Sequence, residues 1–146
     1  MSRGKVLYYG GFDLLPIRDT VNHLRRALGL EPAADGAKRL SKLSRGELHR
    51  IGLDLAFELA PDVLLLDEPW TALEPDAREE LNVRLRSTVE GRVVVCSSHD
   101  LDEVARVADD VVFLAEGLAL WKRRDDDAAP FDRDDLIRVY REAKKT

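Results

Sequence analysis

The stretch Val63-Leu64-Leu65-Leu66-Asp67-Glu68-Pro69 (VLLLDEP) decides the fold. A continuous apolar run that ends in charged residues predicts a strand buried on both faces, as in a parallel sheet. Two adjacent carboxylates at the end of such a strand are costly unless they hold a cation or a reactive water. The same residues also fit an ordinary strand end that enters a turn, so VLLLDEP alone leaves both interpretations open.

Apolar spacing and end signals on both sides of VLLLDEP predict alternating helices and strands. We expect helices over 20–28, 44–60, 75–85 and 100–107 and after Asp132, and strands over 5–9, 92–97, 110–115 and 118–121. The strand over 92–97 is predicted to be buried, and the last two strands to form a hairpin. The pattern predicts an α/β fold, a parallel sheet covered by helices, with ligands at the carboxyl ends of the strands.

Length and composition limit the function classes. The 146 residues are 45% hydrophobic and 35% charged, which indicates one soluble globular domain. The net charge of −5 argues against a nucleic-acid-binding protein. A single cysteine excludes an internal disulfide and a CxxC metal site. No apolar run is long enough to cross a membrane and the start lacks a signal peptide, so we expect a cytoplasmic location.

Two further segments carry candidate chemistry. Leu43-Ser44-Arg45-Gly46-Glu47 opens a predicted helix, where free backbone N–H groups attract anions and Gly46 would admit a phosphate. The spacing of Ser44 and Glu47 equally fits a capping box, which needs no ligand. His99 follows the predicted strand over 92–97, where an imidazole can reach a phosphate or a water. A single histidine is more often structural, and His23 and His49 are assigned no role.

The order and spacing of these segments resemble the ATP-binding cassette (ABC) ATPases over about residues 5–121. Leu43 to Glu47 is similar to the ABC signature, usually LSGGQ, and VLLLDEP to Walker B with its catalytic glutamate. Ala72-Leu73-Glu74-Pro75 resembles the D-loop and His99 the switch histidine. The resemblance implies a partial P-loop NTPase fold of ABC type. Its expected parts are a helical signature subdomain (about 10–60), a sheet core (61–122) and a C-terminal linker and helix (123–146).

The resemblance also implies roles for these residues. Asp67 would hold Mg²⁺, Glu68 would act as the base and His99 would assist catalysis. Ser44 and Gly46 would contact the γ-phosphate of an ATP held by a second ABC ATPase subunit, identical or different. Arg45, Glu47 and Glu74 are the other residues expected to bind the nucleotide, although Arg45 could either attract the phosphate or lie outside the site. The apolar segment 12–17, which contains Phe12 and Ile17, would dock a transmembrane permease subunit, or instead fold into the local core. This arrangement would place the chain at the inner face of the cell membrane, without a nucleic-acid partner.

The sequence departs from the family pattern most clearly at the P-loop. No G-x-x-x-x-G-K-[ST] occurs in the 146 residues, so the backbone donors and the lysine that hold the phosphates are missing. Gly11 stands where the Q-loop glutamine is usual, Arg45 replaces a glycine, Glu47 a glutamine, and Glu74 the D-loop aspartate. We therefore expect ATP and Mg²⁺ to bind only when a P-loop is supplied by a missing segment or by another chain.

Three functions are compatible with these features. The first is the ATPase component of an ABC transporter, present as a truncated or split cassette and inactive in isolation. The second is a non-hydrolysing accessory module that supplies the signature in trans to a partner ATPase. The third, a soluble ABC protein of DNA repair or translation, is disfavoured by the negative charge and the absence of sustained heptads.

Overall fold

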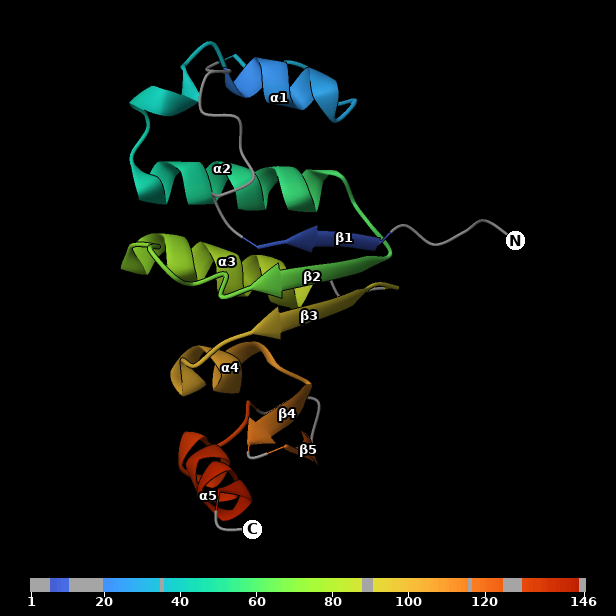
Figure 1. The fold of residues 1–146 in the computed structure, drawn as a ribbon, viewed down its shortest axis with the longest axis vertical. Coiled ribbons are helices and arrows are strands. Elements are labelled where there is room, and N and C mark those ends of the chain that lie inside the picture. The colour runs from blue at the N-terminus through green and yellow to red at the C-terminus, as the bar shows by residue number, and fades with distance from the viewer. Residues whose placement is uncertain are drawn as a thin grey trace, which may run out of the picture. The chain divides into compact units, whose positions relative to one another are not determined.

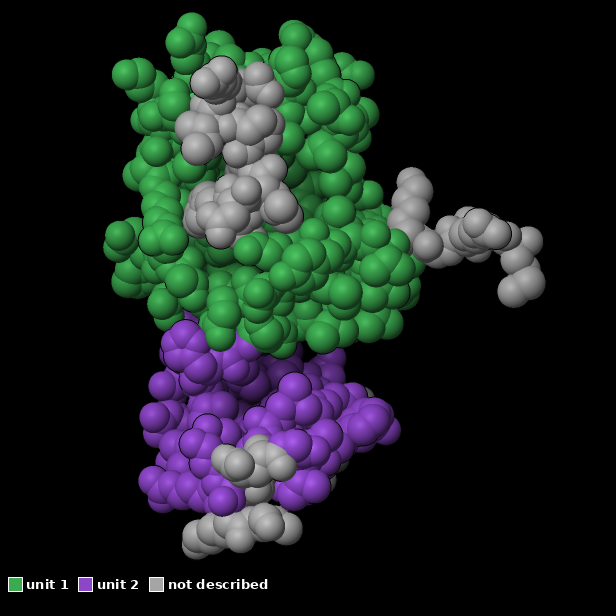
Figure 2. Space-filling model, viewed as in Figure 1, with its two compact units in different colours: residues 1–97 green, residues 98–146 purple. Residues whose placement is uncertain are grey.

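The computed structural model describes residues 6–10, 20–34, 36–87, 91–115, 117–124 and 130–144. In chain order they form β1 (Val6–Tyr9), α1 (Val21–Ala27), the 3-10 helix η2 (Leu40–Lys42), α2 (Arg45–Glu58), β2 (Val63–Asp67), α3 (Pro75–Ser87), β3 (Val93–Ser97), α4 (Leu101–Val107), β4 (Asp110–Ala115), β5 (Leu118–Arg123) and α5 (Arg133–Ala143) (Figure 1). The predicted α/β class is confirmed. The chain divides into two compact units, residues 1–97 and 98–146 (Figure 2).

A three-stranded parallel sheet forms the centre of the first unit, with β2 between β1 and β3. Its register places Tyr8, Leu65 and Val95 side by side, and Asp67 beside Ser97. Because alternate residues of a strand point to opposite faces, Asp67 and Ser97 lie on the same face as Leu65 and Val95.

The opposite face of the sheet is covered by helices. Leu64 and Leu66 are each only 2% exposed there. Tyr9 lies on this face and packs closely on α2, since a Cβ atom at Gly52 would lie 2.3 Å from the Tyr9 hydroxyl oxygen. Glycine at position 52 therefore allows α2 to approach β1, beside which it runs in Figure 1.

The face that carries Asp67 has an exposed apolar surface, which we call the open face. It consists of Val6, Tyr8, Val63, Leu65, Val93 and Val95. Val93 and Val95 on β3 are 56% and 52% exposed, so the prediction that 92–97 is buried is wrong. Burial of β2 on both faces is also wrong, because Val63 and Leu65 are only half-buried. No described element of residues 1–97 covers the open face.

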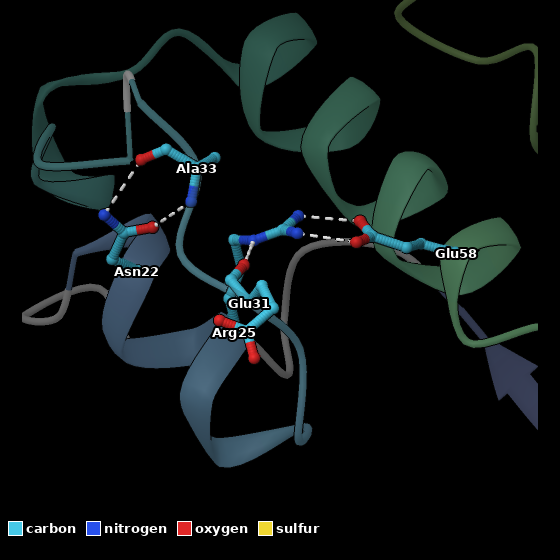
Figure 3. A network of polar contacts seen from close by, with 5 residues as sticks. All are labelled: Asn22, Arg25, Glu31, Ala33 and Glu58. Carbon is cyan, nitrogen blue, oxygen red and sulfur yellow. Dashed lines mark hydrogen bonds and ion pairs between the residues drawn. The ribbon is translucent and has the colours of Figure 1, made fainter.

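Polar contacts fasten α1 and the chain after it to the end of α2. The Arg25 guanidinium donates two hydrogen bonds to the Glu58 carboxylate, at 2.7 and 2.6 Å, and a third to the Glu31 carbonyl (Figure 3). Asn22 exchanges two hydrogen bonds with the Ala33 backbone, at 3.1 and 2.8 Å. The Arg25–Glu58 pair thereby joins α1 to α2. The predicted docking segment, 12–17, lies outside the described residues.

The second unit is a hairpin packed on helices. Strands β4 and β5 pair antiparallel in a register from Asp110 opposite Arg123 to Ala115 opposite Leu118, so the predicted hairpin is confirmed. Its core consists of Ala105, Val111, Phe113, Phe131 and Leu136. Among the described residues, no helix is long and apolar enough to cross a membrane.

Candidate functional site

Asp67 is the last residue of β2 and lies at the carboxyl end of the open face. Its carboxylate accepts a short hydrogen bond from the Ser97 hydroxyl and a longer one, 3.4 Å, from the Tyr8 hydroxyl. The side chain is exposed. An oriented carboxylate beside a hydroxyl offers the hard oxygen donors that Mg²⁺ prefers.

Glu68 follows in a left-handed backbone conformation, with φ of 46°. For a residue other than glycine this conformation costs roughly 1–2 kcal/mol. The Glu68 N–H compensates by donating to the Ser97 carbonyl at 3.1 Å and to the Ser97 hydroxyl at 3.0 Å. Ser97 thus contacts both acidic residues, and a carboxylate held in a strained turn at a strand end is typical of a functional site.

The turn after Glu68 is anchored in the interior of the first unit. Pro69 is fully buried and its carbonyl lies 2.7 Å from Nε2 of the buried His49 of α2. Trp70 is 2% exposed, and its indole N–H donates to the Asn82 side chain at 2.8 Å. Ala72 has a second left-handed conformation, with φ of 63°. The carboxylate of Glu68 is therefore carried by a turn with rigid supports on α2 and α3.

The start of α2 has the capping box that the sequence left as one of two interpretations. The Ser44 hydroxyl accepts from the Glu47 N–H at 3.2 Å, and the Glu47 carboxylate accepts from the Ser44 N–H at 2.8 Å. The hydrogen bond from the Ser44 N–H to the carboxylate, with a contribution from the Ser44 side chain, lowers the pKa of Glu47 below its ordinary value. The Glu47 carboxylate thus bonds to the backbone at the start of its own helix, whereas the Ser44 and Arg45 side chains are exposed.

Gly46 has a structural reason to be glycine. A Cβ atom at this position would lie 3.0 Å from the Ala72 carbonyl oxygen, closer than ordinary van der Waals contact. The start of α2 is therefore packed against the turn that contains Glu68 and Ala72. Glu74, immediately before α3, is exposed. The structure thus brings the signature-like segment, the Asp67–Glu68 pair and the D-loop-like segment into one unit.

His99 belongs to the other unit. It is exposed and follows Ser98, whose hydroxyl accepts from the Asp100 N–H at 3.0 Å. Asp100 in turn caps α4 through the N–H groups of Asp102 and Glu103, as its sequence pattern predicted. Gly11, at the position of the Q-loop glutamine, lies outside the described residues.

The site has too few protein ligands to hold a metal ion without other ligands. Within the part of the chain that the structure describes, no three His, Cys, Asp or Glu residues are grouped to bind a metal ion. Mg²⁺ typically uses one or two carboxylates together with substrate phosphates and water. Asp67 fits that pattern when a bound phosphate supplies further oxygen ligands.

Two residues of the site were not found by sequence reasoning. His49 was assigned no role, although its place in α2 puts it against Pro69. Tyr8 belongs to the predicted strand over 5–9, and only the register of β1 with β2 shows that it lies near Asp67. Because alternate residues of β1 point to opposite faces of the sheet, the register with β2 then places Tyr8 on the same face as Asp67.

Burial of His49 gives the first unit a pH-dependent stability. Desolvation lowers the pKa of His49 in the folded chain, whereas the unfolded chain has the ordinary value near 6.5. The unfolded state therefore binds more protons below pH 6.5, and stability is lost as pH falls through this value toward the lowered pKa. Tyr9, which faces Nδ1, stays neutral because burial raises its pKa to about 12.

We expect His49→Gln to remove this contribution. Between pH 7.5 and 5.5 the wild-type unfolding free energy should fall more steeply than that of the variant, by at most about 1.4 kcal/mol per pH unit. Urea unfolding followed by Trp70 fluorescence, in a Trp121→Phe background, measures both slopes. Equal slopes would show that His49 titrates alike in the folded and unfolded chains.

Comparisons with known proteins identify relatives of this chain. The Nickel import ATP-binding protein NikO of Rhodobacter capsulatus is 42% identical over 105 residues, 69% of this chain and 41% of the relative. The L-cystine import ATP-binding protein TcyN of Bacillus subtilis is 34% identical over 101 residues, 68% of this chain and 39% of the relative. The chain thus spans about two fifths of the length of these relatives. No family model matches it.

Solved structures share the fold. An ATP-binding subunit of an ABC transporter superposes with a TM-score of 0.74 at 20% identity, covering 95% of this chain and 63% of the other. An ATP-binding cassette dimer in a post-hydrolysis state, bound to ADP and Pi, gives a TM-score of 0.66 at 17% identity, covering 82% and 63%. The fold is therefore part of the ABC-type ATPase fold, as predicted.

Proposed function

We propose that this chain is part of the ATP-binding subunit of an ABC transporter, in which ATP binding and hydrolysis drive transport across a membrane. The observation that carries the proposal is the Asp67–Glu68 pair at the carboxyl end of β2, because parallel sheets bind ligands at that edge. The import ATP-binding proteins related to the chain support the same assignment.

Each residue then has a role set by its place. Asp67, fixed by the hydroxyls of Ser97 and Tyr8, would hold Mg²⁺ directly or through water. Glu68, on the turn beyond the strand, would accept a proton from the attacking water. Bound Mg²⁺ supplies charge stabilisation for the transferred phosphoryl group. His99, directly before α4, would assist catalysis.

The start of α2 would act on a second ATP. Its backbone N–H groups and exposed Ser44 and Arg45 would face ATP held by an opposing ATPase subunit, as would Gly46, Glu47 and Glu74. In this structure the Ser44 hydroxyl and the Glu47 carboxylate already bond within the capping box. The hydroxyl can still donate its proton to a phosphate oxygen while it accepts from the Glu47 N–H.

The open face supports a P-loop segment supplied from outside these 146 residues. Strands of a parallel sheet are normally covered on both faces, but Val6, Tyr8, Val93 and Val95 are more than half exposed. The open face leads directly to Asp67, so a P-loop segment packed there would bring its phosphate-binding groups to that carboxylate. The strand edge of β3, paired only with β2 among the described residues, could receive an additional strand.

The proposal includes two further partners. A second cassette subunit would complete each ATP site, and a transmembrane permease subunit would dock near the segment 12–17. Such contacts would hold the chain at the inner face of the membrane. ATPase assays with and without a P-loop-bearing cassette segment test the proposal: the pair should hydrolyse ATP, and failure to form an active complex would count against it.

A further inference from the structure

We propose that His49 is a positioning residue, which holds the Glu68 turn in its left-handed conformation through a hydrogen bond from α2 to the Pro69 carbonyl. The inference rests on the proposed function only for the role of Glu68 as a base. The hydrogen bond from His49 to the Pro69 carbonyl links α2, which starts with the signature-like segment, to the turn that carries the Glu68 carboxylate. His49 touches neither phosphate nor the reacting water in this account.

The hydrogen-bond partners of His49 define its tautomer. The Pro69 carbonyl oxygen can only accept, so Nε2, at 2.7 Å, carries the proton. Nδ1 then has no proton, and the Tyr9 hydroxyl, which also donates to the His49 carbonyl at 3.4 Å, lies 3.3 Å from it. Hydroxyl, imidazole and carbonyl thus form a chain from β1 through α2 to the residue after Glu68. At 3% exposure, His49 makes these bonds away from solvent.

The Glu68 turn needs support on both sides. On one side the Glu68 N–H is held by Ser97. On the other side of Glu68, Pro69 has no N–H to donate, so its carbonyl is the backbone group through which Pro69 can be held in place. The left-handed φ of Glu68 persists only where surrounding contacts determine it. Without the donor at position 49, the buried Pro69 carbonyl would lose its partner and the turn would relax.

Amide hydrogen exchange on the 146-residue chain tests the proposal without ATP. In His49→Leu, exchange of the Glu68 and Thr71 amides should become about ten-fold faster, because one supporting bond is lost. The Thr71 N–H reports the turn because it donates to the Glu68 carbonyl at 3.0 Å. The Leu64 amide of β2 should keep its rate. His49→Gln retains an N–H donor and should restore slow exchange, and His23→Leu, on the exposed face of α1, is the matched control.

Two results of the exchange experiment would overturn the proposal. One is unchanged exchange at Glu68 and Thr71 in His49→Leu, and the other is equal acceleration at Leu64, which would indicate general loosening. Should His49→Leu fail to fold, nitrogen NMR of the wild-type imidazole decides the question: a proton on Nδ1 instead of Nε2 contradicts it.

The catalytic consequence is measured separately in a complex with a P-loop-bearing segment. His49→Leu should lower kcat and leave the KM for ATP unchanged. Faster exchange of the Glu68 and Thr71 amides with an unchanged kcat would support the positioning role of His49. The same result would contradict the role of Glu68 as a base. Failure of the exchange test therefore contradicts the positioning of Glu68, whereas failure of the kinetic test contradicts the proposed function.

Discussion

Replacing Glu68 by glutamine is expected to lower ATP turnover by the complete cassette about 10²- to 10⁴-fold, the range typical of a lost general base. Glutamine has nearly the same shape but cannot take a proton from water. The backbone bonds from Glu68 to Ser97 do not involve the side chain, so the turn should be retained. ATP binding should persist because Asp67 is unchanged. Single-turnover hydrolysis and nucleotide-binding assays measure the two effects.

Glu79→Gln provides the matched control, since Glu79 is an exposed glutamate on α3, outside the Asp67–Glu68 site. It should hydrolyse ATP at the wild-type rate. Equal turnover by Glu68→Gln and wild type would contradict the catalytic role. That result would favour the accessory module, in which the chain contributes its signature-like segment to an ATP site completed by its partner.

Replacing Val93 by aspartate is expected to weaken binding of a P-loop-bearing segment by about 2 kcal/mol or more, as at interface hot spots. This corresponds to roughly a thirty-fold higher Kd. Val93 is 56% exposed, on the open face and at the opposite end of β3 from Ser97. An aspartate there would place an unpaired charge in an apolar contact, far along the strand from Asp67. Calorimetric titration with the segment measures the change.

Val83→Asp is the control for the same chemical change. Val83 is 60% exposed but lies on α3, away from the open face. We expect each variant to change the unfolding free energy of the chain by less than about 1 kcal/mol, the span of strand propensities for Val93 and of helix propensities for Val83. Equal binding by the two variants would show that the open face is not where the segment docks.

Local signals predicted most of the fold. Thr20, Ser44, Asp100 and Asp132 each cap the helix that follows, and each is identifiable because its side chain bonds to nearby N–H groups. The hairpin was identifiable from two β-prone runs around Gly117, whose φ of 79° suits the turn. These features depend on neighbours in sequence, so the sequence reveals them directly.

Features that depend on distant contacts could not be predicted. The apolar run over 93–96 predicts burial, but exposure of Val93 and Val95 depends on what covers the sheet. The packing of Gly46 on Ala72 joins residues 26 positions apart, and that of His49 on Pro69 joins residues 20 positions apart. The left-handed φ of Glu68 is likewise imposed by tertiary contacts, because nothing in its own residue type favours that conformation.

Magnesium-dependent ATP hydrolysis shows whether this chain contributes Asp67 and Glu68 to an ATP site completed by a P-loop from outside its 146 residues. We predict weak ATP binding and no turnover by the purified chain, because several charge-assisted bonds of roughly 1.5–3 kcal/mol each are missing. Addition of a P-loop-bearing segment should produce turnover that Glu68→Gln abolishes. Micromolar ATP affinity with magnesium-dependent hydrolysis by the chain alone would contradict the need for a P-loop from outside the chain.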